Sequence, residues 1–149
     1  MLRKLRRLAS LSPDEWLLLP QLFLAALTIG AGTRLLPLSY LARVLSRCAR
    51  HPWLCRVPAL HRQARLERLT ALVDIAARAT CGGGYCLRRS LLLFWLLSAR
   101  DTSVRLLIGV AKEADVLHGH AWVERGGEIV GDSPEVAEQF ATVLTFDPR

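Results

Sequence analysis

A long apolar stretch that follows a glycine-rich turn dominates the middle of this chain. The turn has the sequence CGGGYC, from Cys81 to Cys86, and the stretch from Leu87 to Leu97 is apolar on nearly every side of a helix. A helix without a polar stripe is buried at the centre of a domain. We therefore expect Cys86 at the N-terminal tip of a core helix.

The tip of a helix favours a nucleophilic role for a cysteine. Unpaired backbone N–H groups and the positive end of the helix dipole converge there, which favours thiolate over thiol. Gly82 to Gly84 would let a substrate backbone approach closely. The alternative is that Cys86 is a packed core thiol, as free cysteines usually are. We expect the same for Cys48 and Cys55, and Cys81 is a weaker duplicate of Cys86 because it precedes the glycines.

The composition is that of one globular domain. The 149 residues are 52% apolar and carry a net charge of +7, but the arginines are spread along the chain instead of forming one basic block. We therefore expect no nucleic-acid partner. The cysteines lack the spacing of a small disulfide scaffold, and no cleavable signal peptide precedes them, so we expect a cytoplasmic protein.

The N-terminal half is predicted to be helical. The first helix should run from about Pro13 to Ile29 and end at the glycines of residues 30–32, because glycine breaks a helical pattern. A second helix is expected from Leu35 to Cys48 and a third from about Pro58 to Ala79.

The first helix has an unusually apolar sequence. The stretch from Trp16 to Ile29 contains Pro20 and falls short of the roughly 20 residues that span a bilayer. We expect a buried or interfacial helix. Four basic residues precede it and leave peripheral membrane contact open: Arg3, Lys4, Arg6 and Arg7.

The periodicity changes from helical to alternating after the cysteine helix. Strands are expected at Val104–Val110, Leu117–Glu124 and Glu128–Val130, then a helical turn at Pro134–Phe140 and a last strand at Thr142–Phe146. The chain is thus predicted to be a single α+β domain over residues 1–149, helical to about residue 80 and followed by the cysteine helix and a small antiparallel sheet.

Two histidines and an aspartate on neighbouring strands could serve the cysteine. His118 and His120 lie on one face of a strand, and Asp132 follows the next strand. A two-residue turn at Gly126 and Gly127 would point Asp132 away from His120, whereas a three-residue loop over residues 125–127 would place the two directly opposite. We expect the three-residue loop, which leaves His118 as a surface or substrate-side histidine.

The order of cysteine helix, histidine strand and aspartate resembles that of the transglutaminase-like, papain-related cysteine enzymes. The chain is more closely similar to the leader peptidase of lasso-peptide biosynthesis, the protease part of the B protein. The similarity covers about residues 80 to 135. It rests on the segments CLRRSL from Cys86, LIGV from Leu107, HAWVE from His120, and Gly131 with Asp132.

The resemblance implies that Cys86, His120 and Asp132 form the triad of a protease that removes the leader from a ribosomal precursor peptide. It also implies a separate leader-binding protein and an ATP-dependent lasso cyclase as partners. No cofactor and no metal are expected.

Other uses of these residues stay open. The same triad could transfer an acyl group to an amine, or Cys86 could merely pack in a non-catalytic helical or membrane-associated binding module. Cys81, Cys86 and the two histidines could also hold zinc, although their spacings depart from the usual ligand patterns. Trp122 is expected in the core or in a pocket wall. We expect Arg89 to reach out of the helix and Ser90 to be a small packing residue.

Overall fold

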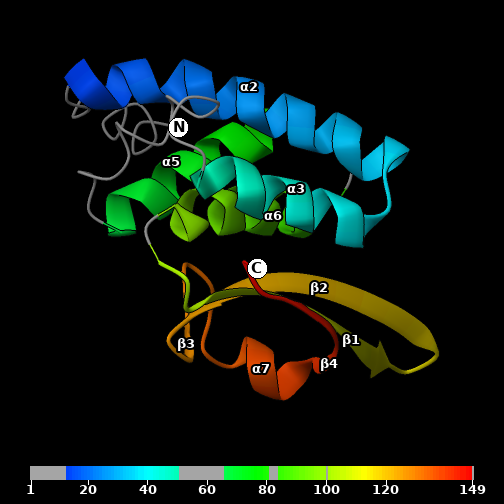
Figure 1. The fold of residues 1–149 in the computed structure, drawn as a ribbon. Coiled ribbons are helices and arrows are strands. Elements are labelled where there is room, and N and C mark those ends of the chain that lie inside the picture. The colour runs from blue at the N-terminus through cyan, green and yellow to red at the C-terminus, as the bar shows by residue number, and fades with distance from the viewer. Residues whose placement is uncertain (1–12, 51–65, 81–83, 100, 149) are drawn as a thin grey trace.

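Helices cover one face of a four-stranded antiparallel sheet (Figure 1). The structure is a computed structural model, and it describes residues 13–50, 66–80, 84–99 and 101–148. The helices are α2 (Pro13–Leu35), α3 (Leu38–Arg50), α5 (Leu66–Ala79), α6 (Tyr85–Ser98) and the short α7 (Val136–Gln139). The strands are β1 (Val104–Glu113), β2 (Val116–Arg125), β3 (Glu128–Ile129) and β4 (Ala141–Phe146). The predicted α+β class, with helices before a small antiparallel sheet, is confirmed, and among the described residues α2, α3 and α5 precede the cysteine helix.

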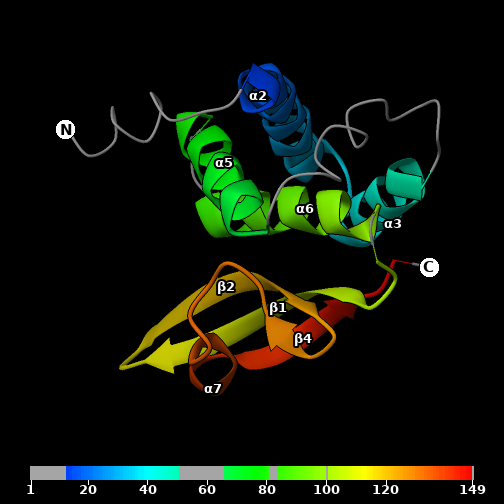
Figure 2. The same ribbon diagram turned by 90° about the vertical axis from the view of Figure 1, so that its left-hand side faces the viewer.

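Helix α6 lies between α2 and the sheet, whereas α7 lies on the other side of the sheet, as Figure 2 shows. Every residue from Arg88 to Ser98 is buried. Its leucines form one core with residues of α2, α3 and α5 on one side and of β1 and β2 on the other. The prediction of a core helix that begins beside Cys86 is therefore confirmed.

Helix α2 continues through the glycines that were expected to end it. A Cβ atom at Gly30 would lie 3.0 Å from Arg88 Nε, and one at Gly32 would lie 3.0 Å from a δ-carbon of Leu41. The glycines therefore let neighbouring helices approach closely, and this packing outweighs the cost of about 1 kcal/mol for each glycine in a helix. The second helix starts at Leu38, after Pro37, whose carbonyl accepts the hydrogen bonds from the N–H groups of Tyr40 and Leu41.

The longer α2 also changes the expectation about its length. Among the described residues, α2 is the one helix long and apolar enough to cross a membrane, over Trp16–Leu35. The expectation that the apolar stretch is too short to span a bilayer was wrong, because the helix does not stop at Ile29. Only 28% of this stretch is buried. A core helix of a soluble protein and a signal sequence would meet the same criterion.

The sheet has the strand order β3-β2-β1-β4 and two different faces. Leu106 pairs with Val123, and both belong to the core that contains α6. Leu107 pairs with Trp122, and both pack on the opposite face with Val136 of α7. Trp122 is fully buried, which confirms its predicted place in the core.

The turn between β2 and β3 has two residues, not the expected three. Arg125 pairs with Glu128 and Glu124 with Ile129, which leaves Gly126 and Gly127 as the turn. Their φ angles are 60° and 90°. Two consecutive positive φ angles match the right-handed twist of a tight hairpin, and glycine adopts them without strain. The expected register was therefore wrong.

Asp101 connects the end of the helical layer to the sheet. Its carboxylate accepts hydrogen bonds from the Ser103 N–H at 2.8 Å and from Arg125 Nε at 2.9 Å. The Ser103 backbone bond and then the Arg125 bond lower the pKa of Asp101 from 3.8 to about 2.

We expect this carboxylate to stabilise the fold in a pH-dependent way. A group whose pKa is lower in the folded than in the unfolded chain stabilises the fold above its unfolded pKa, and this stabilisation is lost as the pH falls. The Tm difference between wild type and Asp101→Asn should thus be full above pH 4 and shrink towards pH 2. Thermal unfolding across this range measures it, and a constant difference would contradict the ionic origin.

Candidate active site

His120 and Asp132 form the central pair of the site. The Nε2 atom of His120 lies 2.9 Å from Oδ2 of Asp132. The other carboxylate oxygen, Oδ1, accepts the N–H of Ser133 at 3.0 Å. Both side chains are 24% exposed. The predicted contact is present, although the predicted register is wrong.

A departure from the sheet ladder explains how the pair forms. The last β2–β3 backbone bond runs from the Val130 N–H to the carbonyl of Val123, and Gly131 then takes a φ of 73°. This left-handed residue turns the chain, so Asp132 no longer follows the alternation of the strand. Its carboxylate therefore reaches His120 instead of pointing away from it.

Aromatic rings fix the orientation of the His120 imidazole. The ring stacks on Trp122, with centroids 6.3 Å apart and planes 16° apart, and it lies 5.1 Å from the ring of Phe140. When Nε2–H donates to Asp132, the neutral ring carries an acceptor at Nδ1. The pair thus presents a base whose tautomer is set by a carboxylate.

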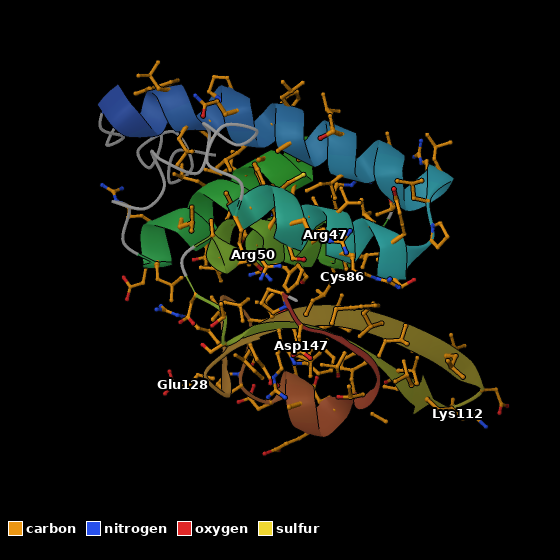
Figure 3. All side chains as sticks on the ribbon, in the orientation of Figure 1. Arg47, Arg50, Cys86, Lys112, Glu128 and Asp147 are labelled. Atoms are coloured by element: carbon orange, nitrogen blue, oxygen red, sulfur yellow. The ribbon has the colours of Figure 1, made fainter. Side chains whose placement is uncertain are left out.

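Cys86 lies in the first turn of α6, between the helical layer and the sheet (Figure 3). The residue before the helix, Gly84, has φ 66° and ψ 37°, a left-handed conformation. The first helical backbone bond runs from the Arg88 N–H to the Gly84 carbonyl. The Cys86 N–H therefore belongs to the group that a helix leaves without an internal acceptor. Cys86 is a free, half-buried cysteine.

The helix face that carries Cys86 contacts the strands of the pair. Residues three and four positions apart share one face of a helix, which groups Cys86 with Arg89 and Ser90. The Ser90 hydroxyl donates to the carbonyl of Ala121 at 2.7 Å, beside His120 in the chain. Arg89 donates to the carbonyl of Gly131, and its Nη1 lies 3.6 Å from Oδ2 of Asp132.

Arg89 does not reach out of the helix as expected. It is 6% exposed, and its Nε donates to Oδ1 of Asp74 on α5 at 2.5 Å. A buried guanidinium thus joins three elements: α5, α6 and the segment after β3. Burial of a charge is unfavourable unless it is paired and hydrogen-bonded, and here the partners include Asp74, Gly131 and Asp132. A charge inside an otherwise apolar helix was the sequence signal for this network.

Asp74 also holds the residue next to Cys86. The Tyr85 hydroxyl donates to the same Oδ1 atom of Asp74 at 3.0 Å, and the Arg78 guanidinium lies 5.0 Å from the Tyr85 ring centroid. Partial burial and then the Asp74 hydrogen bond raise the pKa of Tyr85. Asp74 therefore supports both the start of α6 and the arginine that contacts Asp132.

The structure does not join Cys86 directly to the histidine. Within the described residues, no hydrogen bond links the Cys86 sulfur to His120. His120 shares the sheet face of Trp122, whereas Val123 faces α6. Asp132 is the bridge between the two sides, because it contacts both His120 and Arg89.

The remaining candidates lie apart from this pair. His118 has a half-exposed side chain, with its Nε2 3.9 Å from Glu113, as expected for a surface histidine. Cys48 is half-buried on α3, and Cys55 and Cys81 lie outside the described residues. In the part of the chain that the structure describes, no group of three or more His, Cys, Asp or Glu residues could hold a metal ion.

Comparison with known proteins identifies the family. A sequence model of the transglutaminase-like superfamily matches residues 32–145, which contain α6, the sheet up to Thr145 of β4 and the His120–Asp132 pair. No curated protein and no solved structure matches the chain. The match covers most of the chain and agrees with the observed order of helix and strands. The chain belongs to the transglutaminase-like superfamily.

Proposed function

We propose that this protein is a cysteine endopeptidase that cleaves a peptide bond through Cys86, His120 and Asp132. The contact between His120 Nε2 and Asp132 Oδ2 at 2.9 Å is the observation that carries the proposal. A base oriented by a carboxylate is the arrangement that activates a nucleophilic thiol. The transglutaminase-like superfamily, to which the chain belongs, includes cysteine proteases and acyl transferases.

In the proposed mechanism, His120 takes the Cys86 proton and the sulfur attacks the scissile carbonyl carbon. Nδ1 is the ring atom that accepts this proton, because Nε2 is hydrogen-bonded to Asp132. The Cys86 N–H at the start of α6 would stabilise the oxyanion. The imidazolium then protonates the leaving amine, which departs and leaves a thioester. Water resolves the thioester and returns the thiol.

The proposed substrate is the leader–core precursor of a lasso peptide, delivered by a separate leader-binding protein. The resemblance of the segments around Cys86, His120 and Asp132 to the lasso leader peptidases supports this substrate. The freed core would pass to an ATP-dependent cyclase. Transfer of the acyl group to an amine is the alternative outcome for the same thioester.

Mass spectrometry of the products tests this function. We expect the cognate precursor, incubated with this chain and the leader-binding protein, to yield a free leader and a free core. Hydrolysis leaves a carboxylic acid at the leader C-terminus, whereas acyl transfer leaves an amine adduct with a different mass. An unaltered precursor in the complete mixture would contradict the proposal.

The two histidines of β2 offer a matched control for this experiment. His118 and His120 share one face of the strand, but only His120 contacts Asp132. We expect His120→Ala to lower cleavage by at least about 10³-fold and His118→Ala to leave it unchanged. Equal losses in the two variants would argue against the assigned base.

A further inference from the structure

The outer face of α2 is an apolar surface. Five large apolar side chains, each between 40% and 63% exposed, lie along it: Trp16, Leu17, Phe23, Leu24 and Leu27. Their spacing keeps them on one side of the helix. Exposed apolar residues that stand alone are ordinary, but a continuous stripe of them marks an interaction site.

The opposite face of α2 is firmly attached to the protein. Leu18, Leu22, Ala26 and Ile29 repeat at helical spacing, and none is more than 3% exposed. All four belong to the core that contains α5 and α6. Insertion of α2 across a bilayer would remove all four of these buried residues from the core. The helix can therefore meet a lipid surface only while lying parallel to it.

The charge pattern matches an anionic membrane surface. No charged residue occurs between Glu15 and Arg34, which is exposed in the last turn of α2. Arg3, Lys4, Arg6 and Arg7 precede the helix in the sequence, and the chain carries a net charge of +7. Cations that flank an apolar helix in the sequence can bind the phosphates of anionic lipids, while the apolar side enters the acyl boundary. Tryptophan, here Trp16, favours that boundary.

We propose that the outer face of α2 binds the surface of an anionic lipid bilayer, with the helix lying in the membrane plane. In Figure 1, α2 is the outermost helix of the helical layer, and the sheet lies on the other side of that layer. The His120–Asp132 pair would thus stay on the water side. This membrane attachment is independent of the proposed peptidase activity.

Vesicle co-sedimentation of the full chain tests the proposal. We expect the protein to sediment with vesicles of phosphatidylcholine and phosphatidylglycerol, and less with phosphatidylcholine alone. The double variant Leu24→Glu, Leu27→Glu should lower the bound fraction at least about tenfold, because it places two charges in the apolar stripe. The emission of Trp16 should shift to shorter wavelength with anionic vesicles, and this shift should be absent in Trp16→Phe.

Leu117→Glu is the matched control. Leu117 is 68% exposed at the start of β2, so it is an equally exposed apolar residue outside α2. We expect Leu117→Glu to bind vesicles like wild type, and circular dichroism should show the same helix content in every variant. Precursor cleavage without vesicles should be equal in the α2 variant and wild type.

Three results would overturn the proposal. The first is that the wild type does not bind vesicles. The second is that Leu117→Glu loses as much binding as the α2 double variant. The third is that the protein sediments as a dimer without vesicles and that the α2 substitutions dissociate this dimer. The last result would make the stripe a contact between two copies of this chain.

Discussion

Cys86→Ala is expected to lower precursor cleavage by at least about 10³-fold, because the substitution removes the sulfur that forms the thioester in the proposed mechanism. The side chain is half-buried at the start of α6, so the loss of its sulfur should leave the fold intact. Cleavage rates measured by mass spectrometry, together with circular dichroism, separate the loss of activity from the loss of structure.

Cys48→Ala is the matched control for this prediction. Cys48 is also a free, half-buried cysteine, but it lies on α3. A thiol-directed electrophile should label Cys86 faster than Cys48 in the folded protein, and His120→Ala should reduce this difference. Cleavage that survives Cys86→Ala, or that is lost equally in Cys48→Ala, would remove the thiol from the mechanism.

The sequence predicted the elements of this fold better than their ends and pairings. Alternation identified β1 and β2, and the missing polar stripe identified α6, because burial leaves a period in the chain. The sequence pattern could not show that α2 continues past Gly30. That outcome depends on Arg88, which lies on another helix and packs against the glycine.

The hairpin shows the same limit at the candidate site. Gly126 and Gly127 are compatible with both loop lengths, so local sequence could not choose the register. The contact between His120 and Asp132 was predicted for a reason that proved wrong, since it arises from the turn at Gly131. Whether a strand ends at a given residue depends on what packs against that residue. A Cβ atom added at Gly131 would lie 2.9 Å from Nη2 of Arg89, a contact with a distant helix that the local sequence does not show.

The expectation that Arg89 reaches out of the helix was wrong, because a sequence does not show the distant partners of a side chain. Asp74 lies 15 residues before it and Gly131 lies 42 residues after it. Its contacts give it a second expected role beyond stability. The guanidinium holds the segment that carries Asp132, and Asp132 in turn orients His120. Arg89 would then be a positioning residue for the base.

Arg89→Met is expected to lower the free energy of unfolding by about 2 to 3 kcal/mol. The methionine fills similar space, but Asp74 and the Gly131 carbonyl lose a charged donor. Asp74 is 36% exposed, so water replaces part of the loss at that end. Chemical denaturation measures the change, and an unchanged midpoint would contradict the network's stabilising role.

Arg89→Lys separates positioning from stability. Lysine keeps the charge but lacks the planar fork that reaches Asp74, Gly131 and Asp132 together. Because Arg89 is buried and its proposed action is on Asp132 and not on the peptide, we expect kcat to fall at least about tenfold while KM stays near the wild-type value. Arg88→Lys is the matched control, since Arg88 is equally buried on α6 and donates to the Thr80 carbonyl. If the folded fractions of both variants show the same kcat, Arg89 supports only the core, and the orientation of His120 does not depend on it.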